Sequence, residues 1–141
     1  MANTRQTVVD ALKTILATVP TTVSTGVYDW RDEEREPLDS SELPAILIND
    51  REDQVDELGV VDNHTMAVSI KILSTGLVSA VEAREAGRVI SKLIHDNYTL
   101  DGSALNCHKQ SFDILTEQYG DTLIAAHLEY TIIYRTPPGE L

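Results

Sequence analysis

The chain has 141 residues, of which 42% are hydrophobic, and a formal net charge of −12. This length suits one domain with its own core, and the hydrophobic content excludes a wholly disordered chain. The acidic excess disfavours binding to nucleic acid or to anionic membranes, because both need clustered Lys and Arg. A structural place beside DNA stays open if the DNA must pass without adhering.

Cys107 is the only cysteine, so the sequence offers neither an intrachain disulfide nor a metal site with several cysteine ligands. The first residues lack the basic and apolar regions of a signal peptide, and no apolar run approaches the ~20 residues that span a bilayer. We expect a protein that is made and folded in a reducing cytoplasm.

The first third of the chain predicts a helix, a short strand, a long loop and a central strand. Residues 5–18 repeat their apolar side chains at helical spacing. A short strand is expected to end near Tyr28, and residues 29–43 are expected to form a long acidic loop. Residues 45–49 are apolar on both faces, which is typical of a central strand. The apolar stripe of the helix comprises Val8, Val9, Leu12, Ile15 and Leu16.

The middle of the chain predicts two strands and a second helix. Residues 51–75 alternate as two strands should, and Asp62 and Asn63 are the predicted turn between them. Residues 79–97 have the periodicity of an amphipathic helix. A glycine in mid-helix costs about 1 kcal/mol relative to alanine. Gly87 is therefore expected to permit the close approach of a strand or of a neighbouring subunit.

The last third predicts two strands. Residues 106–115 form the first, a turn is expected at 117–121, and residues 121–136 form the longest strand candidate. His127 and Glu129 lie two residues apart and share a face of that strand. They are expected to form either a pair on the sheet surface or a contact between subunits.

Because strands cluster along the chain instead of alternating with helices, the predicted class is α+β. We expect a single domain over residues 1–141, with two helices packed on one face of a mixed or mostly antiparallel sheet of four to five strands.

The acidic segment 29–62 holds 13 of the 23 acidic residues and raises the question of a metal site. It lacks the spacing of an EF-hand, and two arginines within it compete with any cation. A solvated loop is the alternative, with the lone Trp30 either as an interface anchor or as a lid on the core. The candidate interface loop comprises Trp30, Arg31, Asp32, Glu33, Glu34, Arg35 and Glu36.

Enzyme chemistry finds no support in the sequence motifs. The four histidines are dispersed without metal-ligand spacing, and no nucleophile elbow or phosphate-binding glycine loop is present. Cys107 and His108 are neighbours, so a strand directs them to opposite faces. We therefore predict no catalytic residue, no metal and no cofactor. The histidines are His64, His95, His108 and His127.

The order of elements and a few apolar signatures resemble a known family. After the charged loop comes "LPAILIND" at 43–50, followed by "HTMAVSIKIL" at 64–73 and "AREAGRVISKLI" at 83–94. The closing strand ends in a Y-x-x-x-Y-x-T pattern at 130–136. Over about residues 5–136, the chain resembles the tail terminator proteins of long-tailed bacteriophages and prophages, the minor tail protein U-like family.

This resemblance implies an α+β protein that forms a ring, commonly a hexamer, at the head-proximal end of the tail tube. Such a ring stops polymerisation of the major tail tube protein and then presents a surface to the connector proteins of the head and neck. DNA would pass through the lumen without specific binding. The implied location is the virion, after assembly in the host cytoplasm. No functional residue carries over, because the family works through surfaces.

Two alternatives to a tail terminator stay open. One is a head-side neck or closure ring protein, which belongs to the same structural class. The other is a small hydrolase that would hold a metal ion with carboxylates of residues 29–62.

Overall fold

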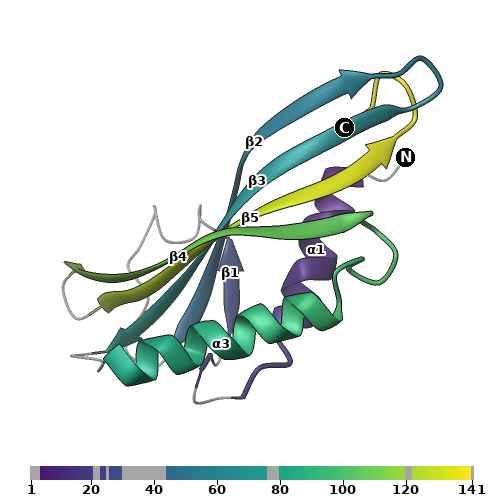
Figure 1. Ribbon diagram of the computed structural model, residues 1–141. Coiled ribbons are helices and arrows are strands. Elements are labelled where there is room, and N and C mark those ends of the chain that lie inside the picture. The colour runs from purple at the N-terminus through teal and green to yellow at the C-terminus, as the bar shows by residue number, and fades with distance from the viewer. Residues whose placement is uncertain are drawn as a thin grey trace.

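The fold of the chain is that of a computed structural model, in which two helices and a five-stranded sheet are described (Figure 1). The described residues are 4–20, 23–24, 26–29, 44–75, 80–119 and 122–140, and within them only the backbone is described at 29, 75, 80, 115–119 and 122–125. The helices are α1 (Thr4–Leu16) and α3 (Ala80–Asp96). The strands are β1 (Val27–Asp29), β2 (Ala45–Glu57), β3 (Asp62–Thr75), β4 (Asn106–Tyr119) and β5 (Thr122–Thr136). The predicted α+β class is confirmed.

The sheet is mixed and has the strand order β1-β2-β3-β5-β4. The β1–β2 pair is parallel, with Val27 opposite Ile46, and the other three pairs are antiparallel. The three-residue β1 and the fourteen-residue β4 are the two edge strands. Strands β2, β3 and β5 therefore lie in the middle of the sheet, each with a neighbour on both sides.

Both helices cover the same face of the sheet, as predicted, and they lie on one side of it in Figure 1. Alternate residues of the central strands point toward them, because side chains on a strand have a period of two. The helices contribute Val8, Val9, Leu12 and Leu16 from α1 and Ala83, Ala86, Ile90 and Ile94 from α3. The strands contribute Ile46, Ile48, Met66, Val68, Ile70, Ile72, Ala126, Leu128, Tyr130, Ile132 and Tyr134.

The β2–β3 hairpin extends beyond the two helices (Figure 1). We call residues 54–61, at its end, the hairpin tip. The predicted turn at Asp62 and Asn63 is wrong, because both residues already pair with β5 in the ladder. The turn lies at residues 58–61 instead, where Leu58 N donates to Val61 O and Gly59 adopts φ +89°. A glycine tolerates this left-handed conformation without strain. Asp62 and Asn63 had been predicted as the turn only because Asp and Asn are common in turns.

A β-bulge in β2 determines which side chains of the hairpin face the helices. Asp50 pairs with Val68 and Asp53 pairs with Met66, so β2 uses one residue more than β3 between these pairs. Because of this extra residue, Asp53 and Asp50 lie on the same face of the sheet. The bulge thus places Asp53, rather than Glu52, over the end of the core.

Several predicted boundaries shift in the structure. The first helix ends at Leu16 instead of 18, and the central strand predicted at 45–49 continues to Glu57. The strand predicted at 106–115 continues to Tyr119. The predicted turn at 117–121 is therefore largely wrong, because cross-strand pairing persists as far as Tyr119 opposite Thr122.

Candidate interaction surfaces

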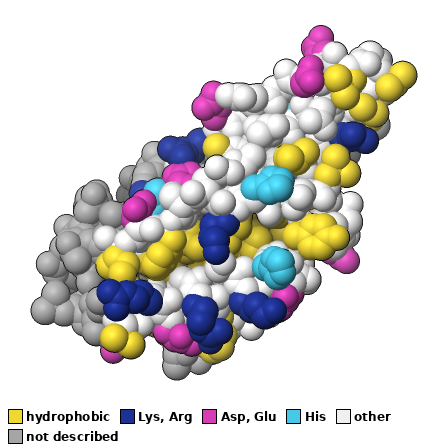
Figure 2. Space-filling view, viewed as in Figure 1, with side chains coloured by type: hydrophobic (Ala, Val, Ile, Leu, Met, Phe, Trp, Pro, Cys, Tyr) yellow, Lys and Arg dark blue, Asp and Glu magenta, His cyan; other side chains and the backbone are white. Residues whose placement is uncertain are grey.

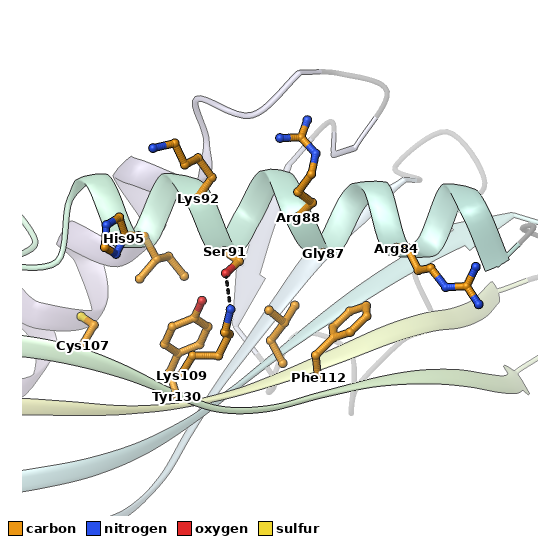
Figure 3. Close-up of a pocket in the computed structure, with 12 residues that line it drawn as sticks. Arg84, Gly87, Arg88, Ser91, Lys92, His95, Cys107, Lys109, Phe112 and Tyr130 are labelled. Atoms are coloured by element: carbon orange, nitrogen blue, oxygen red, sulfur yellow. Dashed lines mark hydrogen bonds between the residues drawn. The ribbon is translucent and has the colours of Figure 1, made fainter.

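A groove of about 540 Å³ lies between α3 and the edge strand β4 (Figure 3). Its floor is apolar and aromatic, with Phe112 from β4 and Leu128 and Tyr130 from β5. Gly87 and Ser91 of α3 form the opposite wall. We call this feature the α3–β4 groove.

Gly87 is explained by the packing of this groove. A Cβ atom at Gly87 would lie 2.5 Å from Phe112 Cε2, closer than real Cβ contacts allow. In Figure 3 the Phe112 ring rises from β4 toward the helix at Gly87. The close approach of a strand, one of the two expected reasons for this glycine, is therefore present within the chain. Its role as a subunit contact stays a prediction.

Basic side chains gather along the groove although the chain as a whole is acidic. Arg84, Arg88, Lys92 and Lys109 line it, and they are four of the eleven Lys and Arg residues. Figure 2 shows basic side chains beside an apolar band that crosses the visible face of the molecule. This basic, apolar-floored surface suits an acidic partner with apolar side chains.

Some of these cations already have partners within the chain. Arg88 Nη2 lies 2.6 Å from Glu85 Oε1, and this pair lowers the pKa of Glu85 and raises that of Arg88. Lys92 pairs with Asp96 at 3.0 Å, and Lys109 Nζ donates to Ser91 Oγ at 2.8 Å. All are exposed, so water screens them and an incoming carboxylate can compete.

Cys107 also lines the groove and behaves as a packing residue. Burial raises the pKa of its thiol from 9.0 to about 12. A thiol that is almost wholly protonated at neutral pH is a poor nucleophile. Burial also raises the pKa of the neighbouring Tyr130. These groups favour a binding surface over a nucleophilic site.

The hairpin tip has the opposite charge and exposes apolar side chains. Val55, Leu58 and Val60 are 45%, 51% and 82% exposed. Asp56 and Glu57 are exposed beside them at the end of β2. Apolar side chains exposed in a cluster often mark an interaction surface.

His127 and Glu129 lie together on the uncovered face of the sheet. Their Nε2 and Oε1 atoms are 2.9 Å apart, although their orientation does not make a hydrogen bond. Arg51 Nη2 donates to both carboxylate oxygens of Glu129 at 2.8 Å, and Ser69 Oγ donates to Oε1 at 2.8 Å. The expected pair on the sheet surface is present, whereas its use between subunits stays a prediction.

A buried polar network joins the base of the hairpin to β5 and was not predicted. Asp53 Oδ2 accepts a hydrogen bond from Tyr134 OH at 2.6 Å and lies 3.1 Å from His64 Nδ1. His64 Nε2 lies 2.7 Å from Thr136 Oγ1, and the His64 ring stacks on Tyr134 with centroids 4.6 Å apart. Burial and the hydrogen bond to Asp53 raise the pKa of Tyr134. The network joins β2, β3 and β5. Because His64 is fully buried, its ring is not available to solvent as a nucleophile.

The acidic segment divides between structural and exposed carboxylates where it is described. Asp50 pairs with Arg5 at 2.8 Å, and Asp62 Oδ2 accepts from Gly139 N at 2.8 Å. Glu52, like the two acids of the hairpin tip, is exposed. Within the described ranges no group of three or more His, Cys, Asp or Glu side chains could hold a metal ion. The predicted interface loop, Trp30 to Glu36, lies outside the described residues.

The α3–β4 groove was also missed at the sequence level, although a signal for it exists. Arg84, Arg88 and Lys92 recur every four residues, which places three cations along one side of a helix. Lys109 lies on β4, and only the packing of β4 against α3 shows that it belongs to the same surface.

Comparison with known proteins found no matching family model and no matching curated protein. Among the residues that the structure describes, no helix is long and apolar enough to cross a membrane.

Proposed function

We propose that the protein is a phage tail terminator, a ring-forming structural protein that caps the head-proximal end of the tail tube. The observation that carries the proposal is the resemblance over about residues 5–136, which implied an α+β fold with helices and strands in this order. In this role the ring stops polymerisation of the tail tube protein. It then offers its other surface to the connector proteins of the head.

The distribution of surfaces supports this proposal. A closed ring needs two different surfaces on each subunit, since head-to-tail contacts join one surface to the other. The helices cover one face of the sheet, which leaves the polar face, the edge of β4 and the projecting hairpin for contacts. Such a ring protein needs no catalytic site.

The charge of the chain also suits a DNA conduit. A net charge of −12 gives few phosphate contacts, so DNA would slide through a lumen instead of binding to its wall. The acids of the loop 29–43 are the proposed lumen-facing or tube-facing groups.

The test is to remove the gene from a phage that carries it and to measure tail length by electron microscopy. Tails are expected to be overlong and unjoined to heads, and expression of the wild-type protein in trans should restore normal length. Tails of normal length in the knockout, together with a protein that is monomeric at every concentration, would refute the proposal.

A second experiment tests the acidic loop with a variant that is designed to keep the fold. Because β1 and β2 are parallel, the chain between them must return from the end of one strand to the start of the next, which takes about a dozen residues. The loop should therefore keep its length, with Asp32, Glu33, Glu34 and Glu36 replaced by Asn or Gln. We expect unchanged thermal stability and impaired capping. Unimpaired capping would exclude the loop from contact with the tube.

A further inference from the structure

We infer that the hairpin tip of one subunit docks into the α3–β4 groove of a second copy of this chain. The inference deepens the proposed function by assigning its inter-subunit contact, and it rests on that function for the closure of the ring. The occupant is identified by its charge, its apolar side chains and its position in the fold.

The two surfaces are complementary in charge. The tip presents Asp56 and Glu57, while Arg84, Arg88 and Lys109 are among the residues that line the groove. Arg84 makes no ion pair or hydrogen bond with any described residue. It is therefore the cation most readily available to a carboxylate from outside.

The two surfaces also match in their apolar content. Leu58 and Val60 at the tip are more than half exposed, and Phe112 in the groove is 38% exposed. Ile114, which follows on the same face of β4, is 40% exposed. Docking would remove these side chains from water, and burial of apolar area contributes roughly 25 cal/mol per Å² before the costs of association.

A tip cannot fill the groove of its own subunit. Asp62, next to the tip, pairs with Thr136, whereas the groove lies at Tyr130 and Leu128 farther along the same strand. Thr136 lies six positions beyond Tyr130 along β5, which corresponds to about 20 Å at roughly 3.3 Å per residue. Figure 1 shows the hairpin pointing away from α3. Contact between different surfaces on two copies is head-to-tail, which generates a ring when the rotation closes.

The experiment is a charge exchange with molar mass in solution as the readout. The tip variant Asp56→Lys/Glu57→Lys and the groove variant Arg84→Glu/Arg88→Glu are each compared with the wild-type chain by light scattering. We expect the wild type to exceed the monomer mass of 15.6 kDa. Each variant alone should weaken association about tenfold or more, because like charges then face each other. The combined variant should recover most of the wild-type mass.

The control Asp10→Lys/Asp101→Lys adds the same positive charge at exposed positions outside both surfaces and should associate like the wild type. The inference is overturned if the wild type is monomeric, if either variant associates as the wild type does, or if the combined variant stays dissociated. It is also overturned if the control dissociates equally, since net charge would then be the cause. Variants that fail to assemble while the knockout leaves tail length normal would refute the proposed function and keep the inference.

Discussion

The Phe112 ring lies against the backbone of Gly87, so that a Cβ atom on the glycine would fall 2.5 Å from Phe112 Cε2. This contact lets the edge strand β4 approach the middle of α3. It also reverses the usual effect of replacing a helical glycine. In an open helix, alanine would stabilise the chain by about 1 kcal/mol relative to glycine.

We expect Gly87→Ala to lower the free energy of unfolding by about 1–2 kcal/mol, because overpacking outweighs the gain in helix propensity. Urea unfolding at neutral pH measures this change in the free energy of unfolding. The same change in a Phe112→Ala background should instead be neutral or stabilising, since the space is then empty. Destabilisation in both backgrounds would show that Phe112 is not the cause.

Asp53 should be the more important of two neighbouring acids at the base of the hairpin. Replacing Asp53 by Ala leaves the hydroxyl of Tyr134 and the ring of His64 without their buried partner, at a cost of about 1–3 kcal/mol for each group. Glu52→Ala is the matched control, because Glu52 is exposed and should change stability by no more than about 0.5 kcal/mol. Chemical unfolding of both variants decides the matter, and equal costs would contradict the network.

Cys107 should react slowly in the folded protein and should make stability fall in alkali. Its pKa is about 12 when folded, against 9.0 as the ordinary value. As the pH rises above about 9, the unfolded thiol ionises first, so the free energy of unfolding declines up to about pH 12. At pH 8 a thiol reagent should label the native protein at least about tenfold more slowly than the denatured one. Equal labelling rates would contradict the burial of the thiol. The variant Cys107→Ala should show a shallower alkaline decline.

The Arg51–Glu129 pair should contribute measurable coupling on the uncovered face of the sheet. Arg51 donates to both oxygens of a carboxylate that is mostly shielded, and this geometry is worth about 0.5–1 kcal/mol in a double-mutant cycle. The coupling should shrink as salt is added. The wholly exposed Arg88–Glu85 pair serves as the comparison and should show no measurable coupling. A cycle that gives equal values for both pairs would show that shielding has no effect here.

Elements with a strong period were predictable from the sequence. The stripe from Val8 to Leu16 packs in the core as its helical spacing predicted, and strands β3 and β5 form within the ranges 51–75 and 121–136 that were predicted as strands. Boundaries were less predictable wherever pairing with a neighbour decides the length of a strand. Residues 51–57 were predicted to belong to a separate strand, but they continue β2, because β3 offers hydrogen-bonding partners beyond the bulge as well.

The candidate surfaces were harder to predict because they depend on cross-strand register. Glu129 and His127 were paired from their spacing, but Arg51, which completes the cluster, is 78 residues away. Asp53 looked like one more acid of a solvated run. Its burial depends on a bulge, and a single extra residue in a strand leaves no clear mark in composition or periodicity.

That bulge also sets a parity rule for the hairpin. Since side chains alternate along a strand, deleting one residue between Asp50 and Asp53 would remove the bulge and leave Asp53 opposite Met66 on the same face. Deleting one residue beyond the bulge, such as Gln54, would instead exchange the inward and outward sets, and Val55 would move to the other surface of the tip. A single-residue deletion should therefore be tolerated at the bulge, whereas changes of length elsewhere in the hairpin should be tolerated only in steps of two residues. The bulge is thus a position at which the hairpin could lose one residue without changing which side chains face the core.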